Sequence, residues 1–239
     1  MRNVAIILAG GVGQRMGAPI PKQFLEIKGK PIIVHTINNF EVNPNVDAVL
    51  IVCNADWIDY FKELVSKYDL KKVKWIVSGG NTSHDSTRNG LFHLRDLLDE
   101  DDFVIIHDAA RPILPQKAID DMLAVAHEKG NASLAIPCHE TVIYTDDQKS
   151  GDKDLDRSKL MRVQTPQAYR FGEILPLYDR AEKENKHDFV YADLVAIYYG
   201  VRIYFSKGFT NNIKVTSPED IPLCESLMGF DDSQLYSDR

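Results

Sequence analysis

The sequence has few cysteines, no long apolar run and no excess of basic residues. Its 239 residues include only Cys53, Cys138 and Cys224, and no CxxC spacing joins them. This pattern argues against a disulfide framework or a structural zinc site and is typical of a reducing compartment. The apolar run Val4–Ala9 is too short for a signal peptide, and no stretch approaches the ~20 apolar residues of a membrane-spanning helix. We therefore expect a cytoplasmic protein without a membrane anchor.

The charge balance is acidic. Thirty-five Asp and Glu residues outnumber 28 Lys and Arg residues, which gives a formal net charge of -7. A protein that coats nucleic acid needs a basic face, so we expect no nucleic-acid partner, although a small basic pocket for one phosphorylated ligand stays possible. A hydrophobic content of 44% is typical of a globular chain. The length favours one domain over residues 1–230, followed by a frayed polar tail over 231–239.

Strands and helices alternate through the first half of the chain. Short apolar runs predict strands at Val4–Leu8, Ala48–Cys53, Val73–Val77 and Asp102–Ile106. Helical spacing of apolar residues predicts helices at Lys30–Phe40, Trp57–Tyr68 and Ser86–Leu98. This alternation predicts an α/β fold: a Rossmann-like, mostly parallel sheet with helices on both faces.

The second half is less regular. We predict helices at Ala118–Lys129, Phe171–Lys183, Tyr191–Tyr199 and Pro218–Leu227, the last capped by Ser217, and strands at Ser133–Pro137 and Arg202–Ser206. Residues 138–162 break the pattern with a polar run that contains five aspartates between 146 and 156. We interpret them as a protruding β-arm, with a mobile surface loop as the alternative.

Three polar segments each follow a predicted strand. They are Gly10–Met16, Gly79–Ser86 and His107–Pro112. In parallel sheets, ligands bind beyond the carboxyl ends of the strands. The three segments are therefore expected to meet at one edge of the sheet.

The turn over residues 8–17 is rich in glycine and contains Arg15. Glycine lets the backbone approach a ligand and leaves N–H groups available to phosphate oxygens. The turn matches neither GxGxxG nor a Walker A loop, so an ordinary tight turn stays open as an alternative. Lys22 follows two prolines that stiffen the backbone, and a lysine beside a phosphate loop is a candidate charge stabiliser.

His107, Asp108 and Arg111 stand at the end of the fourth predicted strand. Asp108 could hold a divalent metal or orient a hydroxyl, and Arg111 could form a bidentate contact with phosphate. For His107 we favour a structural hydrogen bond. Two further polar segments, Gln164–Gln167 and Asn212–Thr216, carry little weight alone.

Five ordered motifs, LAGGxGxRMG, PKQFL, HDAARP, QTPQ and NIKVTSPED, carry a resemblance that runs from about Val4 to Leu227. At these spacings the sequence resembles the cytidylyltransferases of polyol phosphates. That group includes the enzymes of ribitol 5-phosphate and of 2-C-methyl-D-erythritol 4-phosphate. The resemblance implies transfer of a cytidylyl group from CTP to a sugar-alcohol phosphate, which gives a CDP-alcohol and pyrophosphate.

The resemblance also implies a role for individual residues. The phosphates of CTP would be cradled by the backbone of Leu8, Ala9, Gly10, Gly11 and Gly13. The transferring group would be stabilised by Arg15, Lys22 and Lys214. Cytosine and ribose would be bound by Gly80, Asn81 and Ser86.

Asp108 would hold Mg²⁺ or another divalent cation and also contact the second substrate, the polyol phosphate. That substrate would further be bound by Arg111, Thr141, Arg157 and Thr165. In the family, the arm that carries the positions of Thr141 and Arg157 reaches into a partner subunit. The resemblance therefore implies a homodimer.

The sequence departs from both branches of the family in places. The LAGG turn is closer to the ribitol type, whereas HDAARP is closer to the erythritol type. Asn81 and Ser83 stand where the family often has an acidic residue and an arginine. The segment Phe189–Leu194 replaces the TD[ED]AS of the erythritol enzymes and the TDAC of the ribitol enzymes.

On balance these features favour ribitol 5-phosphate or a similar acyclic acceptor, with 2-C-methyl-D-erythritol 4-phosphate as the alternative. A nucleotidylyltransferase for another base or for a hexose phosphate is a second enzyme hypothesis. An inactive nucleotide-binding protein is the hypothesis from a different class. The joint presence of Arg15, Lys22, Asp108 and Lys214 speaks against it.

Overall fold

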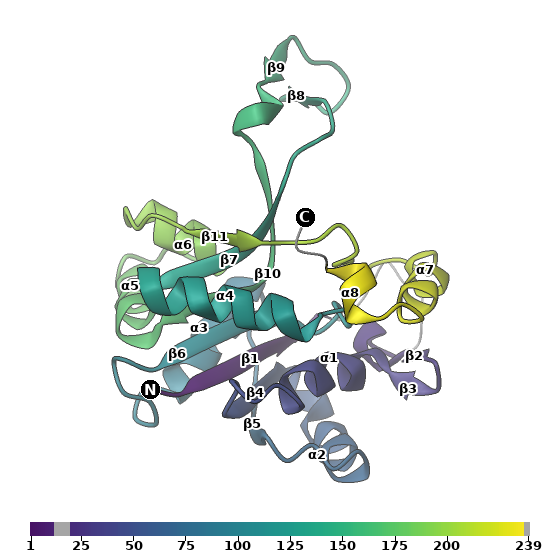
Figure 1. Cartoon of the computed structure of the whole chain (residues 1–239). Helices are drawn as coiled ribbons and strands as arrows, with labels where there is room; N and C mark the ends of the chain where they lie inside the picture. Colours follow the sequence, from purple (N-terminus) through teal and green to yellow (C-terminus); the bar gives the residue numbers. More distant parts are fainter. Residues whose placement is uncertain (12–19, 237–239) are drawn as a thin grey trace.

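One sheet runs through the body of the protein, whose computed structural model describes residues 1–11 and 20–236. Its seven strands in the described chain are β1 (Asn3–Ala9), β4 (Ala48–Cys53), β5 (Val73–Ser78), β6 (Phe103–Asp108), β7 (Asn131–Pro137), β10 (Met161–Arg170) and β11 (Phe205–Lys207). They lie in the order β11-β7-β10-β6-β1-β4-β5 (Figure 1). β10 is antiparallel to β6 and β7, whereas the other neighbours pair in parallel. The predicted mostly parallel sheet is confirmed.

Helices cover both faces of this sheet. The helices are α1 (Ile32–Glu41), α2 (Ile58–Lys67), α3 (Ser83–His93), α4 (Gln116–Lys129), α5 (Phe171–Lys183), α6 (Ala192–Tyr198), α7 (Asp220–Leu227) and α8 (Asp232–Leu235). Buried residues of α1, α2 and α4 share one hydrophobic cluster, and those of α3, α5 and α6 share the other. β1 contributes side chains to both clusters, because successive residues of a strand point to opposite faces of the sheet. Ala5 and Ile7 belong to the first cluster, and Val4 and Ile6 belong to the second.

β10 is the main element that the sequence pattern does not predict. Its ten residues, MRVQTPQAYR, mix polar, charged and apolar side chains without alternation. The strand nevertheless lies between two buried strands, and residues 164–169 are buried. Buried glutamine and threonine side chains there find polar partners, so their burial is compatible with a stable core.

The bounds of two predicted elements, Ser86–Leu98 and Arg202–Ser206, differ most from the structure. α3 begins at Ser83 and ends at His93, because Thr82 and Asp85 form a capping box at its start and the chain turns after Leu94. β11 is confined to Phe205–Lys207, since the Asn131 side chain bonds the backbone of Arg202 and Tyr204 upstream of it.

The cap of α7 also differs from the prediction. The helix begins at Asp220 with Glu219 as its N-cap. The Asp220 carboxylate accepts hydrogen bonds from the backbone N–H groups of Thr216 and Ser217 at 2.7 and 2.9 Å. Ser217 is therefore a donor to the helix start and not its cap.

The expected frayed tail is ordered as far as the structure describes it. Residues Asp232–Leu235 form α8, and Tyr236 is buried against Phe209. The Tyr236 hydroxyl lies 3.0 Å from the Asp121 carboxylate and 3.1 Å from the Lys207 carbonyl, so either oxygen can accept its proton. The buried Tyr236 ring, the packing of Leu235 and the hydrogen bond from the Gln116 N–H to Asp232 hold this segment on the body.

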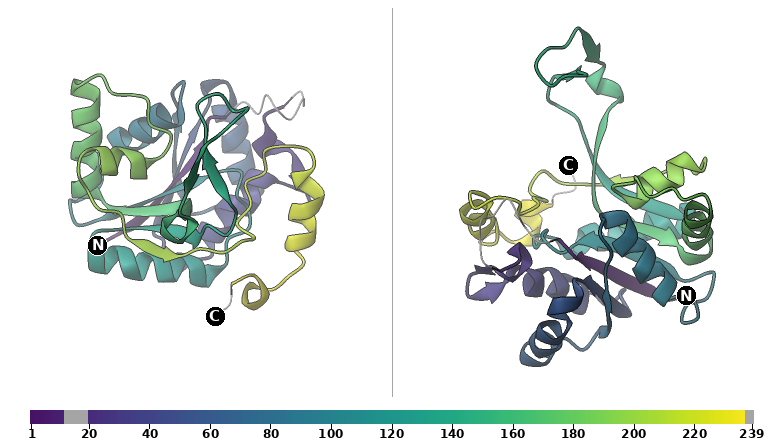
Figure 2. Two further views of the ribbon diagram at one scale, coloured as in Figure 1. Left: turned by 90° about the horizontal axis from the view of Figure 1, so that it is seen from above. Right: turned by 180° about the vertical axis from the view of Figure 1, so that it is seen from behind.

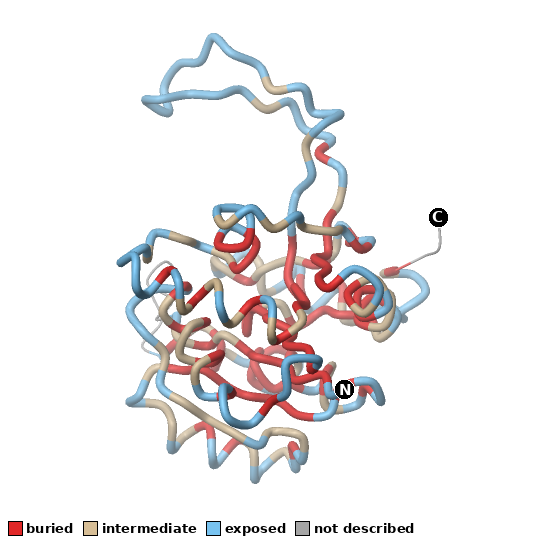
Figure 3. Tube along the Cα trace, turned by 90° about the vertical axis from the view of Figure 1, so that its left-hand side faces the viewer, coloured by how far each residue is buried: buried red, intermediate tan, exposed pale blue. Residues whose placement is uncertain are grey.

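The predicted arm stands out from the body. Two short strands, β8 (Val142–Tyr144) and β9 (Lys153–Leu155), pair antiparallel at its end. β7 leads into the arm and β10 leads back, so it rises from the sheet beside β11 (Figures 1 and 2). Nearly all of its residues are exposed (Figure 3). A second small ribbon, β2 (Glu26–Ile27) with β3 (Lys30–Pro31), precedes α1.

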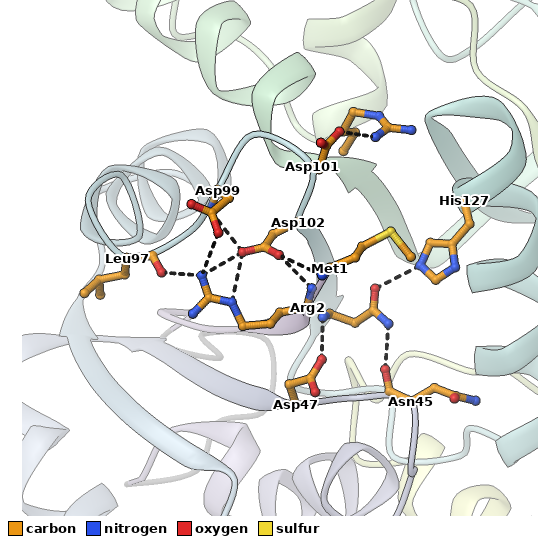
Figure 4. A network of polar contacts seen from close by, with 11 residues as sticks. Met1, Arg2, Asn45, Asp47, Leu97, Asp99, Asp101, Asp102 and His127 are labelled. Carbon is orange, nitrogen blue, oxygen red and sulfur yellow. Dashed lines mark hydrogen bonds and ion pairs between the residues drawn. The ribbon is translucent and has the colours of Figure 1, made fainter.

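The amino-terminal end of β1 is held by a polar network (Figure 4). The backbone N–H and Nε of Arg2 donate to the Asp102 carboxylate at 2.7 and 3.0 Å. The Asn3 N–H donates to Asp47 at 2.7 Å, and the Asn3 side chain donates to the Asn45 carbonyl. Burial alone would raise the pKa of Asp102, but hydrogen bonds from the Asp99 and Arg2 backbones and the Arg2 guanidinium outweigh it, so the pKa is lowered.

Asp102→Asn is expected to lower the free energy of unfolding by about 2 kcal/mol at pH 7, because it removes charge-assisted hydrogen bonds from a buried acceptor. The lowered pKa means that the carboxylate stabilises the fold above about pH 4 and that this contribution is lost as the pH falls further. Urea unfolding between pH 7 and pH 2.5 measures both effects. Asp101→Asn is the control, because its carboxylate is 84% exposed. Equal losses in the two variants, or a difference that persists unchanged at pH 2.5, would contradict the assignment.

Candidate active site

A cleft lies beyond the carboxyl ends of the parallel strands. Its described lining comes from the segments after β1, β5 and β6, from the Lys22 region and from Lys214. The lining residues are Leu8, Ala9, Gly10, Gly11, Lys22, Gln23, Gly80, Asn81, Thr82, Ser83, Ser86, Asp108, Ala109, Ala110 and Lys214. The expected convergence of three polar segments is thus confirmed for their described parts. Gly13 and Arg15 lie outside the described residues.

The Ser86 hydroxyl lies where two of these segments meet. It accepts a hydrogen bond from the Gly80 N–H at 3.2 Å. A Cβ added at Gly79 would lie 2.8 Å from Oγ of Ser86, and one added at Gly10 would lie 3.2 Å from it. Glycine at these two positions therefore allows α3 to approach the end of β1. Thr82, Ser83 and Ser86 at the start of α3 therefore line the cleft next to Gly10.

Lys22 is positioned by the residues that follow it. The buried Gln23 side chain donates to the Ala9 carbonyl at 2.7 Å, which ties this segment to the end of β1. Phe24 packs among the rings of Trp57, Tyr60 and Phe61. Nζ of Lys22 donates to the Val215 carbonyl at 2.9 Å. The Lys22 ammonium is therefore held beside the strand-end backbone and next to the residue that follows Lys214.

Asp108 forms the acidic centre of the cleft. Its Oδ1 accepts from Nζ of Lys214 at 2.9 Å, and its Oδ2 accepts from Nε of Arg111 at 3.0 Å. Burial raises the pKa of this carboxyl, but the two cations outweigh that effect and lower it. Asp108 is thus ionised at neutral pH, and the cluster carries one net positive charge.

β10 and the 209–212 segment hold this cluster from the side. The Asp108 N–H donates to Oγ1 of Thr165 at 3.2 Å, and Nδ2 of Asn212 donates to the Thr165 carbonyl at 2.8 Å. The Asn212 carbonyl in turn accepts from Nη1 of Arg111 at 2.7 Å. The guanidinium of Arg111 is therefore engaged within its own chain, and neither Arg111 nor Thr165 is part of the cleft lining.

His107 has a structural environment, as we favoured. Nε2 is 3.0 Å from the Arg111 carbonyl, and the ring packs edge-on against Phe40. Burial lowers the pKa of His107 to about 4, against a weaker opposing effect of the hydrogen bond to Arg111. The neutral imidazole supports the turn that carries Asp108.

Thr141 and Arg157 are not brought to this cleft within one chain. Both are exposed on the arm, and Nη1 of Arg157 donates to the His139 carbonyl at 2.8 Å. The described residues contain no group of three or more His, Cys, Asp or Glu side chains that could hold a metal ion. No helix in the described part of the chain is long and apolar enough to span a membrane.

Comparison with known proteins decides the family. The family model described as 2-C-methyl-D-erythritol 4-phosphate cytidylyltransferase matches residues 3–229. The chain belongs to this cytidylyltransferase family. Cytidylyltransferases use CTP as co-substrate, so the family makes the chain a CTP-dependent nucleotidyltransferase.

Relatives of the chain carry two different acceptor names. The ribitol-5-phosphate cytidylyltransferase of Lacticaseibacillus paracasei is 38% identical over 94% of this chain and 97% of that protein. The 2-C-methyl-D-erythritol 4-phosphate cytidylyltransferase of Clostridium novyi is 37% identical over 95% of this chain and 96% of that one. The crystal structure of the Francisella tularensis enzyme of the latter name matches with a TM-score of 0.81, at 26% identity, over 95% of this chain and 99% of that chain.

Sequence reasoning missed several residues of this cytidylyltransferase cleft. Gln23, Thr82 and Ala110 line it without a catalytic residue type to mark them. It also missed that Tyr191, in the segment that departs from the family pattern, lies with its ring 5.8 Å from Nζ of Lys214. Only the departure itself could have signalled Tyr191.

Proposed function

We propose that this enzyme transfers the cytidylyl group of CTP to an acyclic polyol phosphate and that ribitol 5-phosphate is its preferred acceptor. The observation that carries the proposal is the joint placement of Lys22, Lys214 and Asp108 with a glycine backbone in one cleft. Phosphoryl-type transfer needs positioning and positive charge more than covalent help from the protein. This cleft offers both.

In the proposed reaction a phosphate oxygen of the acceptor attacks the α-phosphorus of CTP. The new P–O bond forms as the bond between the α-phosphorus and the bridging oxygen breaks, and pyrophosphate leaves with that electron pair. Lys22 donates hydrogen bonds to the oxygens on which negative charge develops, and Lys214 does so from the other side of the α-phosphate. Gly10 and Gly11 supply N–H groups to the triphosphate, and Arg15 is expected to join them.

Asp108 acts in this scheme through its charge. It holds the Lys214 ammonium at 2.9 Å, and thereby aims it into the cleft. A magnesium ion fits the donor chemistry as a companion of CTP, since Mg²⁺ in proteins commonly takes one carboxylate together with substrate phosphates and water. Asp108 is the carboxylate that the described cleft offers, and the ion would neutralise charge on the leaving pyrophosphate.

The nucleoside and the acceptor would occupy opposite sides of Asp108. Gly80, Asn81 and Ser86 are proposed to bind cytosine and ribose. These residues follow β5 at one edge of the sheet, whereas Lys214 lies beside Asp108 at the end of β6. The acceptor phosphate would be bound by Arg111 and Thr165, which contact Asp108 from outside the described cleft lining, and, from a second subunit, by Thr141 and Arg157. The exposure of the arm supports the homodimer, because a small two-stranded hairpin has little stability alone.

Residues 1–230 are taken as one cytidylyltransferase domain that includes the arm. The three free cysteines and the use of CTP support a cytoplasmic location.

The test is pyrophosphate release with CTP and a panel of polyol phosphates, with Mg²⁺ and with EDTA in its place. We expect kcat/KM for ribitol 5-phosphate to exceed that for 2-C-methyl-D-erythritol 4-phosphate, by up to about 10⁴ where buried polar groups must pair with substrate hydroxyls. Faster turnover of the methylerythritol phosphate would reverse the acceptor ranking. Pyrophosphate release from no acceptor in the panel would favour the inactive nucleotide-binding protein, and turnover only with another nucleotide would favour the second enzyme hypothesis.

A further inference from the structure

The segment before α6 lies against the catalytic cleft. Tyr191 directly precedes α6 in an extended conformation, and its ring lies 5.8 Å from Nζ of Lys214. Nζ of Lys214 is in turn 2.9 Å from Asp108. Asp108, Lys214 and Tyr191 therefore form a continuous row that leads from the cleft to α6. The first two line the cleft, and Tyr191 extends that wall on the side of Lys214.

Tyr191 also borders a second, apolar hollow. That hollow is lined by residues of β10, α6 and β11. These three elements lie near the base of the arm in Figure 1. Val163, Leu194 and Phe205 line it together with Tyr191, and each of these three is more than 40% exposed. The Tyr191 ring thus lies near the Lys214 ammonium of the cleft and also lines the apolar hollow. A ring in that place has a flat apolar face and one hydroxyl to present to a ligand beside Lys214.

A buried polar network fixes the start of α6. The Asp193 carboxylate is 4% exposed and accepts from Oγ of Ser133 at 2.7 Å, from Nε2 of Gln167 at 2.9 Å and from the Tyr169 hydroxyl. All three donors are neutral, and burial raises the pKa of Asp193 despite them. A buried carboxylate with three directed partners has little freedom to move.

The network joins α6 to the strand that supports Asp108. Gln167 and Tyr169 belong to β10, and so does Thr165, whose Oγ1 accepts from the Asp108 N–H. The same strand therefore supports both residues. It contacts Asp108 directly through Thr165, and it holds Asp193, which is two positions after Tyr191 in the chain. This shared support ties the backbone that carries Tyr191 to the same strand as the Asp108 cluster.

From this arrangement, and resting on the proposed function for the acceptor side of the cleft, we infer that Tyr191 is a specificity-determining residue for the polyol phosphate, with Asp193 as its positioning residue. The carbon chain of the acceptor packs its C–H groups along the ring while its phosphate lies at the cations. An unbranched carbon chain can pack flat against a rigid ring, whereas a methyl branch would clash with it. The ring therefore discriminates between ribitol 5-phosphate and 2-C-methyl-D-erythritol 4-phosphate by shape. Its hydroxyl can pair with one acceptor hydroxyl.

The experiment compares kcat/KM of the two acceptors for Tyr191→Ala and Tyr191→Leu. We expect the ratio of ribitol to methylerythritol phosphate to fall at least about 10-fold in both, the size expected from the loss of one packed ring and its hydrogen bond. The KM for CTP should stay within about 3-fold, because the ring lies on the acceptor side. Tyr198→Ala is the matched control: this tyrosine is the last residue of α6, which Tyr191 precedes, is 53% exposed and is absent from the described lining of the cleft and of the hollow.

Asp193→Ala tests the positioning role. It should lower the acceptor ratio in the same direction as Tyr191→Ala, and Asp193→Asn, which keeps the shape and one acceptor oxygen, should restore part of the ratio. A merely structural role predicts equal losses of kcat for both acceptors and no change in their ratio. That result, or an unchanged ratio in both Tyr191 variants, would overturn the inference. A wild-type protein with no activity on any polyol phosphate would instead refute the proposed function.

Discussion

Lys22→Ala should lower kcat for ribitol 5-phosphate and CTP by about 10²- to 10³-fold, which is typical of removing one donor to developing negative charge. The effect should fall on kcat more than on the KM for CTP, because the charge that Lys22 stabilises is largest in the transition state. The fold should be retained, since Gln23 and Phe24 provide the buried contacts of this segment. Steady-state pyrophosphate release and a thermal melt measure the two parts of the prediction.

Lys30→Ala is the matched control for Lys22→Ala. Lys30 is exposed, eight positions along the chain, and does not line the cleft. Its replacement should leave kcat within about 2-fold, as for most surface substitutions. If Lys22→Ala retained turnover near that of the wild type, the proposed role of this lysine would be refuted.

Arg157→Ala should lower kcat/KM for the acceptor by about 10- to 100-fold through the loss of a charged hydrogen bond to phosphate. In one chain the Arg157 side chain is exposed on the arm and absent from the described cleft lining. The loss is therefore expected only if the arm serves the site of a second subunit. Lys159→Ala, an exposed lysine of the same turn, is the control and should behave as the wild type.

Mixing the Lys22→Ala and Arg157→Ala proteins separates the two arrangements of the arm. In a twofold dimer, random exchange makes about half of the dimers mixed. If arms act across the dimer, each mixed dimer has one intact site, so activity should rise to about one quarter of the wild type. If the arm acts within its own chain, both sites of a mixed dimer stay impaired and no activity returns. A monomer in gel filtration at micromolar concentration would also contradict the homodimer.

The sequence predicted the strands that are apolar throughout and the loops that follow them. Ala48–Cys53 is buried at every residue and was predicted to the residue, because a strand covered on both faces reads as an unbroken apolar run. The order of strands and loops in the sequence likewise predicts that Gly10, Gly80 and Asp108 lie at one edge of the sheet, and all three line the cleft. Such convergence follows from the parallel topology alone.

The parts that could not be predicted depend on contacts between distant residues. β10 is buried although its sequence is polar, because Gln164, Thr165 and Gln167 find partners on segments far along the chain. The pairing of Asp108 with Lys214 spans 106 positions. Tyr236 was expected in a frayed tail for the same reason, since a single ring gives no periodicity from which burial could be inferred.

The network at the amino-terminal end of β1 has a consequence for engineering this enzyme. Asp102 and Asp47 hold one end of a seven-residue strand, and the cleft begins at the other, about 20 Å away at ~3.3 Å per residue. The two ends share no side chain among these contacts. Free-energy changes at such separated positions usually add. Substitutions near Asp102 that raise stability should therefore combine with substitutions at Tyr191 that change acceptor specificity, and each should keep its full effect.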